Sequence, residues 1–289
     1  IVAMSPSVRV ALGEGFSDKI GENNEGKIIT AFRRLGFDDV FDVDFGADMT
    51  VVEESNEFVE RFLSGEHLPM FTSCCPAWVK FVEQNYPEYI GNLSTCKSPQ
   101  QMLGAVIKTY YAEKLGVSAD KLYFVSVMPC IAKKMERQRP FMSSTPFGLD
   151  TDAVITASEM IEMIKEKNID FNSLPNGKFD SLFGVSSGSG VIFGTTGGVM
   201  EASLRTLSDK LGGKKIKKVE YLLVRGLGGI KEATIKVGNK NVRVAVASGL
   251  QNAKVLMDDI KSGKRYYDFV EVMACSGGGS KGKGMPKHF

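Results

Sequence analysis

The chain has 289 residues, of which 43% are hydrophobic and 24% charged, a composition that excludes disordered, collagen-like and low-complexity proteins. Its 36 basic and 34 acidic side chains leave a formal net charge of +2, which is too balanced to indicate a nucleic-acid binder. No apolar run approaches the roughly 18–20 residues that a membrane-spanning helix needs, and residues 1–13 lack the layout of a signal peptide. We therefore expect a globular cytoplasmic protein without a membrane span.

Short β-branched runs alternate with longer amphipathic stretches, which is the pattern of an α/β protein. The predicted strands are 8–12, 40–43, 122–127, 153–156, 221–224, 242–247 and 269–273. The predicted helices are 51–63, 100–115 and 159–167. The first helix is expected to begin at a capping box of Thr50 and Glu53 and to end at Gly65. The polar stretch 168–178, which contains Pro and Gly, predicts the loop between two tightly packed lobes.

The five cysteines are the main chemical signal of the sequence, since two histidines are too few for a conventional zinc site or a His-based triad. An odd number of thiols in a chain of this length does not indicate a disulfide framework. Cys74 and Cys75 stand before a helix-opening proline, and Cys130 and Cys275 each follow a predicted strand. Because ligands bind at the carboxyl ends of strands in α/β sheets, these thiols could meet and hold an iron–sulfur cluster. The spacing alone leaves open the alternative that they are small buried hydrophobes.

The residues around the cysteines resemble the sequence motifs of a known protein family. The relevant segments are 6–14 (PSVRVALGE), 72–78 (TSCCPAW), 97–101 (KSPQQ), 128–136 (MPCIAKKME), 194–202 (GTTGGVMEA) and 271–275 (EVMAC). In this order they resemble the signature segments of the catalytic H-domain of FeFe hydrogenases. The resemblance implies one H-domain over residues 1–289, built from two lobes that are each a twisted sheet flanked by helices, with the cofactor between the lobes.

The resemblance also implies the cofactor and its ligands. The H-cluster of the family is a 4Fe–4S cubane joined to a two-iron subsite that carries CO, CN and a bridging azadithiolate. By position, Cys75, Cys130 and Cys275 match cubane ligands, and Lys133 matches the residue that hydrogen-bonds a cyanide. The other residues that match the cofactor pocket are Pro6, Ser7, Ser98, Gln100, Met128, Pro129 and Met273.

A proton route is implied in the same way. Cys74 matches the thiol that passes protons to the two-iron subsite, and Glu54, Glu57 and Ser94 match the groups that connect this thiol to solvent. Glu54 and Glu57 are three residues apart on a predicted helix and therefore share a face. A solvated helix face is the alternative interpretation, and the matched spacing to Cys74 favours the route.

One position departs from the family pattern. The family has a second cysteine four residues after the first in its third segment, and this cysteine bridges the cubane and the two-iron subsite. Here that position is Gly279, although the following residues 282–286 keep the family register. The cubane is therefore expected to have three thiolates and another ligand, or the two-iron subsite is anchored differently or absent. Cys96 is the one unassigned thiol, and we interpret it as a core cysteine.

Two functions remain open at this point. The first is an FeFe hydrogenase that reversibly reduces protons to dihydrogen, with maturation proteins supplying the two-iron subsite. Since the chain has no further cysteine clusters, electrons from ferredoxin or a similar carrier would enter at the cubane. The second is a non-catalytic hydrogen or redox sensor, or a relative of iron–sulfur assembly factors. Gly279 favours the second function, and Cys74 with its complete proton route favours the enzyme. A basic run within 214–218 is either a solvated turn or a docking patch for an acidic electron carrier.

Overall fold

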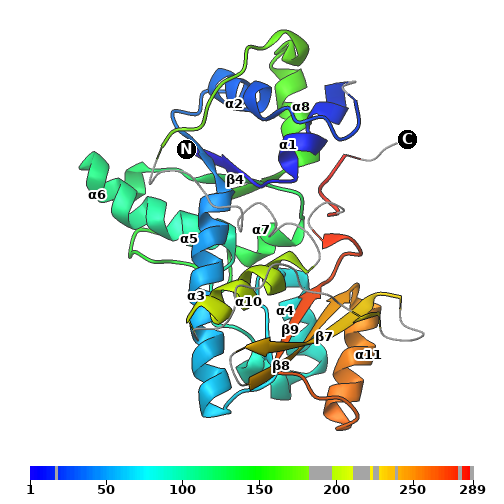
Figure 1. Cartoon of the computed structure of the whole chain (residues 1–289). Coiled ribbons are helices and arrows are strands. Elements are labelled where there is room, and N and C mark those ends of the chain that lie inside the picture. Colours follow the sequence, from blue (N-terminus) through cyan, green and yellow to red (C-terminus); the bar gives the residue numbers. More distant parts are fainter. Residues whose placement is uncertain are drawn as a thin grey trace. The chain divides into compact units, whose positions relative to one another are not determined.

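The computed structural model of the chain describes residues 1–16, 19–181, 197–210, 222–223, 228–237, 240–278 and 282–286. These residues belong to two compact units, each built around its own sheet (Figure 1). Unit 1 consists of Ile1–Ala47, Pro99–Val191 and Gly279–Phe289, and unit 2 consists of Asp48–Ser98 and Ile192–Gly278. Within the described residues, no helix is long and apolar enough to cross a membrane.

The sheet of unit 1 contains four parallel strands in the order β2-β1-β4-β5. Their bounds are β1 Val2–Met4, β2 Val40–Asp42, β4 Val125–Met128 and β5 Ala153–Thr156. One face is buried under three helices, α1 Val8–Ala11, α2 Glu25–Arg34 and α8 Ala157–Glu166. The other face packs against α5 Pro99–Val106 and the π-helical turn η3 Ile107–Tyr111 that continues it. The remaining elements of the unit are η1 Gly13–Phe16, α6 Ala112–Leu115, η4 Ala119–Lys121, α7 Ala132–Glu136 and η5 Phe171–Ser173.

The sheet of unit 2 has the order β3-β9-β8-β7-β6, in which β3, β9 and β8 are parallel and β7 and β6 are antiparallel to their neighbours. The bounds are β3 Met70–Phe71, β6 Leu222–Leu223, β7 Ile230–Val237, β8 Lys240–Ser248 and β9 Phe269–Met273. Helices α4 Pro76–Asn85 and α11 Leu250–Lys261 cover one face, where they bury Trp78 and Met257. Helices α3 Val43–Ser64 and α10 Gly198–Lys210 cover the other face, where Phe58 stacks on Phe269. The short helix η2 Pro87–Asn92 follows α4.

Most predicted elements are confirmed. The strands expected at 40–43, 122–127, 153–156, 242–247 and 269–273 correspond to β2, β4, β5, β8 and β9. The helix expected at 100–115 is present as α5, η3 and α6, and the one at 159–167 is α8. Of the strand expected at 221–224, Leu222–Leu223 form β6 and the rest lies outside the described residues.

Two predictions at the start of the chain and of α3 are wrong. The strand predicted at 8–12 is helix α1, and the first strand is β1 at Val2–Met4. Val8, Ala11 and Leu12 are buried at helical spacing, which explains why this apolar run is not extended. The helix predicted from residue 51 begins at Val43, so Thr50 lies inside it, where its hydroxyl donates to the carbonyl of Lys97.

The segment predicted to join the two lobes, 168–178, lies inside unit 1. Phe171 belongs to the core of that unit, and the hydroxyl of Thr30 donates to the carbonyl of Pro175 at 2.7 Å. The chain passes from one unit to the other after Ala47, Ser98, Val191 and Gly278. The loop-like composition of 168–178 therefore reflects a connection within one unit.

Candidate metal centre

The segments of two cysteines meet at one end of the unit 2 sheet. Cys75 follows β3 and Cys275 follows β9, and these strands are parallel neighbours. The backbone N–H of Ala274 donates to Sγ of Cys75 at 3.5 Å. Cys75 is also the N-cap of α4, where Pro76 opens the helix and the helix dipole favours negative charge. Cys74, the preceding residue, is buried with an exposed fraction of 6%.

The third predicted thiol is in unit 1, again after a strand. Cys130 follows β4, and Pro6 and Ser7 follow the neighbouring parallel strand β1. The backbone carbonyl of Pro129 accepts the N–H of Gly284 at 2.8 Å. A Cβ atom on Gly282 would lie 2.1 Å from the same carbonyl oxygen, so any residue with a side chain would clash with the backbone at this position.

Lys133 lies in a buried polar cluster of unit 1. Its Nζ is 2.9 Å from both carboxylate oxygens of Glu136, whose exposed fraction is 3%. Nε2 of Gln100 donates to Oε2 of Glu136 at 2.7 Å and to the carbonyl of Lys133 at 3.3 Å. Oε1 of Gln100 is buried and has no hydrogen-bond partner among the described residues. Glu136 thus contacts two residues that match the cofactor pocket; it ends the 128–136 segment, but the sequence assigned it no role.

The carboxylate of Glu57 is surrounded by donors. Oγ of Ser94 donates to Oε2 at 2.8 Å, the N–H of Thr95 lies 3.0 Å from both oxygens, and Nη2 of Arg61 is 2.6 Å from Oε1. The thiol of Cys96 is 3.7 Å from Oε2. Cys96, expected to be a core cysteine, is half-buried and contacts this carboxylate, because the segment after Ser94 folds over Glu57. Burial, with the negative charge of Glu54, raises the pKa of the Cys96 thiol, so the thiol keeps its proton and donates a hydrogen bond to Glu57.

Glu54 lies one turn before Glu57 on α3 and is fully buried. Within the described part of the chain, neither of its carboxylate oxygens has a hydrogen-bond partner. Burial raises the pKa of Glu54 to about 8, and the charges of Glu57 and Glu271 act in the same direction. The hydroxyl of Ser94 and the backbone of Ser73 lower this pKa in part, without meeting the geometry of a hydrogen bond. Glu54 is therefore a carboxylic acid that keeps its proton near neutral pH.

Glu271, which begins the 271–275 segment but received no role from the sequence, is a second fully buried carboxyl in unit 2. Its oxygens accept the N–H groups of Gly197 at 2.7 Å and Met200 at 2.8 Å, at the start of α10. Burial raises its pKa to about 7, and the two hydrogen bonds oppose this effect. The signal available in the sequence was its position inside an apolar strand, where an acid needs a specific partner.

The remaining predicted positions have the following surroundings. Ser98 and Met128 are buried, and Met273 is half-buried at the end of β9. All five cysteines lie in the described ranges, and none is in a disulfide. Among the described residues, no group of three or more His, Cys, Asp or Glu side chains is close enough to hold a single metal ion. Gly279, the first residues of the 194–202 motif and the basic run within 214–218 lie outside the described residues.

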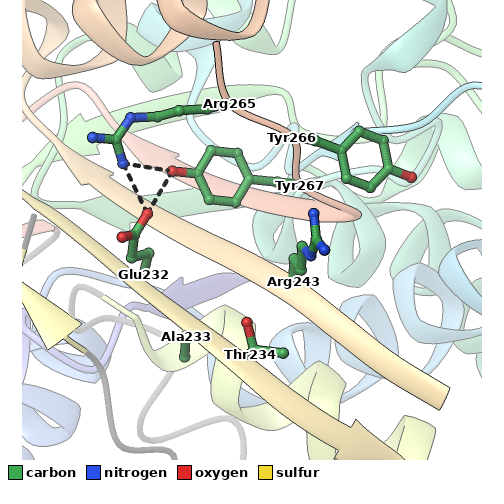
Figure 2. Close-up of a pocket in the computed structure, with 7 residues that line it drawn as sticks. All are labelled: Glu232, Ala233, Thr234, Arg243, Arg265, Tyr266 and Tyr267. Atoms are coloured by element: carbon green, nitrogen blue, oxygen red, sulfur yellow. Dashed lines mark hydrogen bonds and ion pairs between the residues drawn. The ribbon is translucent and has the colours of Figure 1, made fainter. Parts of the chain in front are cut away.

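A pocket of about 250 Å³ lies at the opposite end of the unit 2 sheet from Cys275, beside the start of β9. Figure 2 shows Arg265 and the hydroxyl of Tyr267 both directed at the carboxylate of Glu232, at 2.9 Å and 2.8 Å. Arg243 lies over the ring of Tyr266. The pocket contains none of the predicted cofactor residues.

Comparison with known proteins identifies the family. The sequence profile described as "Iron only hydrogenase large subunit, C-terminal domain" matches residues 1–282. The chain belongs to this family. It is 49% identical over 288 residues to the periplasmic Fe hydrogenase large subunit of Nitratidesulfovibrio vulgaris, covering 99% of this chain and 68% of that protein. It is 48% identical over 294 residues to the NADP-reducing hydrogenase subunit HndD of Solidesulfovibrio fructosivorans, covering 100% of this chain and 50% of that protein. The chain thus spans half of the length of this second relative.

The fold agrees with this assignment. A variant of an FeFe hydrogenase from Chlamydomonas reinhardtii, solved in its apo form, superposes with a TM-score of 0.89 at 40% identity, covering 99% of this chain and 79% of that chain. More distant relatives include a probable cytosolic Fe–S cluster assembly factor of Nematostella vectensis, 35% identical over 96% of this chain and 65% of that protein. The family therefore includes hydrogenases and assembly factors, and the expected α/β hydrogenase fold is confirmed.

Proposed function

We propose that the chain is the catalytic domain of an FeFe hydrogenase, which reversibly reduces protons to dihydrogen at an H-cluster. The observation that carries the proposal is the contact between the Cys75 and Cys275 segments, in the same unit as the acids Glu54 and Glu57. Higher identity to hydrogenases, 48–49%, than to the assembly factor, 35%, supports it.

The donor set of the chain suits an iron–sulfur cubane held by three thiolates. Soft thiolates delivered by strand ends and a helix N-cap are typical iron–sulfur ligands, and Cys75, Cys130 and Cys275 would supply them. Lys133, held by Glu136, would donate to a cyanide of the two-iron subsite. When bound, the H-cluster supplies the redox chemistry that combines protons and electrons into dihydrogen. The residues that would enclose it are Pro6, Ser7, Ser98, Gln100, Met128, Pro129 and Met273.

The chain's own residues would move the protons. Arg61 and Glu57 lie at the outer end, with side chains 12% and 14% exposed. The hydroxyl of Ser94, bonded to Glu57, can accept a proton from one side while it donates on the other. Glu54 is the buried acid that would follow, and the backbone of Ser73, the residue before Cys74, is among the groups that lower its pKa. We therefore assign Glu57, Ser94, Glu54 and Cys74 as the order of the route inward.

Electrons would come from ferredoxin or a similar carrier, and maturation proteins would insert the two-iron subsite. A second candidate function is an iron–sulfur assembly factor or a hydrogen or redox sensor. Gly279 favours it, because glycine cannot supply the thiolate that bridges the two parts of the cofactor.

The experiment that separates the two functions is infrared spectroscopy of the protein co-expressed with the hydrogenase maturation proteins. We expect carbonyl and cyanide bands together with dihydrogen evolution from a reduced carrier. The Gly279→Cys variant, matured identically, is the matched comparison and should retain more of the two-iron subsite. Iron content without carbonyl and cyanide bands in both proteins would contradict the proposal and favour the second function.

A further inference from the structure

Glu271 is a buried carboxylate to which the proposed proton route gives no role. It has an exposed fraction of 0% and lies on β9 between Val270 and Val272, which are core residues. Both of its oxygens accept N–H groups at the start of α10, from Gly197 and Met200. Backbone N–H groups at a helix N-terminus stabilise a carboxylate in its charged form. The two hydrogen bonds therefore favour a negative charge on Glu271, against the opposing effect of burial, which raises its pKa to about 7.

The packing of α3 on β9 makes Glu271 face Glu54. The rings of Phe58 and Phe269 stack across this interface, with centroids 4.7 Å apart and planes inclined by 19°. Glu54 precedes Phe58 by one helical turn and so shares its face of α3. Glu271 follows Phe269 by two residues and so shares its face of β9. The two carboxyl groups consequently project into the same buried interface as the Phe58–Phe269 stack, one helical turn away on α3 and two residues away on β9.

Two carboxyl groups in one dry interface do not ionise independently. A charge on the first makes the second hold its proton more firmly, because little water is present to screen the interaction. The titratable groups near Glu54 come from three elements: Glu57 on α3, Cys96 in the segment after Ser94, and Glu271 on β9. Of these, only Glu271 has its carboxylate fixed by a helix N-terminus on the core side of the interface.

We propose that Glu271 is a positioning residue of the proton route: its carboxylate, fixed by the start of α10, faces Glu54 and keeps a proton on it. The inference rests on the proposed role of Glu54 and explains how this acid is loaded before it delivers to Cys74. The direction of its effect agrees with the raised pKa of Glu54, to which burial contributes most and the charges of Glu57 and Glu271 add.

The test is a titration of Glu54 in the cofactor-free protein by infrared spectroscopy. The carbonyl stretch of its protonated acid is isolated by subtracting the spectrum of the Glu54→Gln variant. For the Glu271→Gln variant, the spectrum subtracted is that of the double variant Glu54→Gln and Glu271→Gln. We expect the midpoint of the Glu54 band in Glu271→Gln to fall by about one pH unit, which is a tenfold loss of proton affinity. Glu271→Asp, which keeps the charge, should restore most of the shift. Because no cofactor is needed, the result does not depend on whether the protein turns over dihydrogen.

A packing variant separates charge from structure. Phe269→Leu disturbs the α3–β9 contact without changing any charge, and it should leave the midpoint near that of the wild type. An unchanged midpoint in Glu271→Gln, or an equal fall in Phe269→Leu, would overturn the proposal. If Glu271→Gln does not fold, the shape of the wild-type titration curve tests the proposal instead. Coupled acids give titration curves broader than that of a single site, whereas two sharp single-site curves would show that the carboxyls act independently.

Discussion

The backbone nitrogen of Ala274 lies 3.5 Å from Sγ of Cys75, so the segments of two predicted cluster ligands are in contact although they are about 200 residues apart in the chain. The contact follows from topology, because β3 and β9 are parallel neighbours and both end at this edge of the sheet. An N–H group aimed at a sulfur also stabilises the thiolate that an iron ion needs.

Replacement of either cysteine is expected to weaken iron binding. Cys75→Ser and Cys275→Ser should each lose most of the iron and sulfide retained after anaerobic reconstitution, because a serine hydroxyl is a much poorer ligand for iron than a thiolate. Iron and sulfide analysis with the absorption spectrum measures this loss. Cys96→Ser is the control and should keep the wild-type iron content. Full iron content in Cys275→Ser would show that the cluster is held elsewhere.

Cys74 is expected to act on protons and not on the cluster. Cys74→Ala should lose most of the dihydrogen turnover while iron content and infrared bands stay as in the wild type, since a methyl group can neither donate nor accept a proton. Turnover and spectra are measured on the same matured samples. Wild-type turnover in a fully assembled Cys74→Ala protein would remove this residue from the route.

Local patterns predicted the strands of the core well, because β2, β5 and β9 are short apolar runs bounded by clear turn signals. They failed for β7, whose residues alternate between lysine, glutamate and apolar side chains on an exposed hairpin. They also missed the true capping box, in which Thr156 accepts the N–H of Glu159 and Glu159 accepts that of Thr156. The box at Thr50 was matched by sequence, but tertiary packing extends α3 beyond it.

The sequence singled out candidate site residues, but it did not predict the contacts that they make. Cysteine spacing and family motifs identified Cys74, Cys75 and Glu54, each of which is buried or partly buried in unit 2. Glu136 and Glu271 lie in quoted segments but received no role, because their contacts are with residues distant in sequence, such as Gln100 and Gly197. No local pattern reports which side chain a buried carboxylate meets.

The glycine at position 282 is expected to be required for the stability of unit 1. A Cβ atom there would lie 2.1 Å from the carbonyl oxygen of Pro129, which is backbone and cannot move aside freely. Gly282→Ala should therefore destabilise the protein by about 1–3 kcal/mol and lower the melting temperature by several degrees. Gly91→Ala is the control, since its Cβ would be 3.5 Å from His67, an ordinary contact. Equal melting temperatures for Gly282→Ala and the wild type in thermal unfolding would contradict the close approach.

The pH dependence of stability is expected to report the buried acid Glu54. Its pKa is raised by burial to about 8, from an ordinary value of 4.5 that applies to the unfolded chain. Between these values the folded protein holds a proton that the unfolded protein has released. The free energy of unfolding must therefore fall as the pH rises, by up to about 1.4 kcal/mol per pH unit.

Glu54→Gln removes this term, so its stability should decline less than that of the wild type between about pH 5 and pH 8. The difference should be smallest at the acidic end, where the pH is closest to the ordinary pKa of 4.5 and the unfolded chain has released least of this proton, and should grow toward pH 8 in favour of the variant. Urea unfolding of the cofactor-free proteins at several pH values measures it. Glu53→Gln, which removes an exposed carboxylate from the same helix, should follow the wild type. Parallel stability curves for Glu54→Gln and the wild type would mean that Glu54 ionises in the folded protein as readily as in the unfolded chain, and the proton would then not be stored at this position.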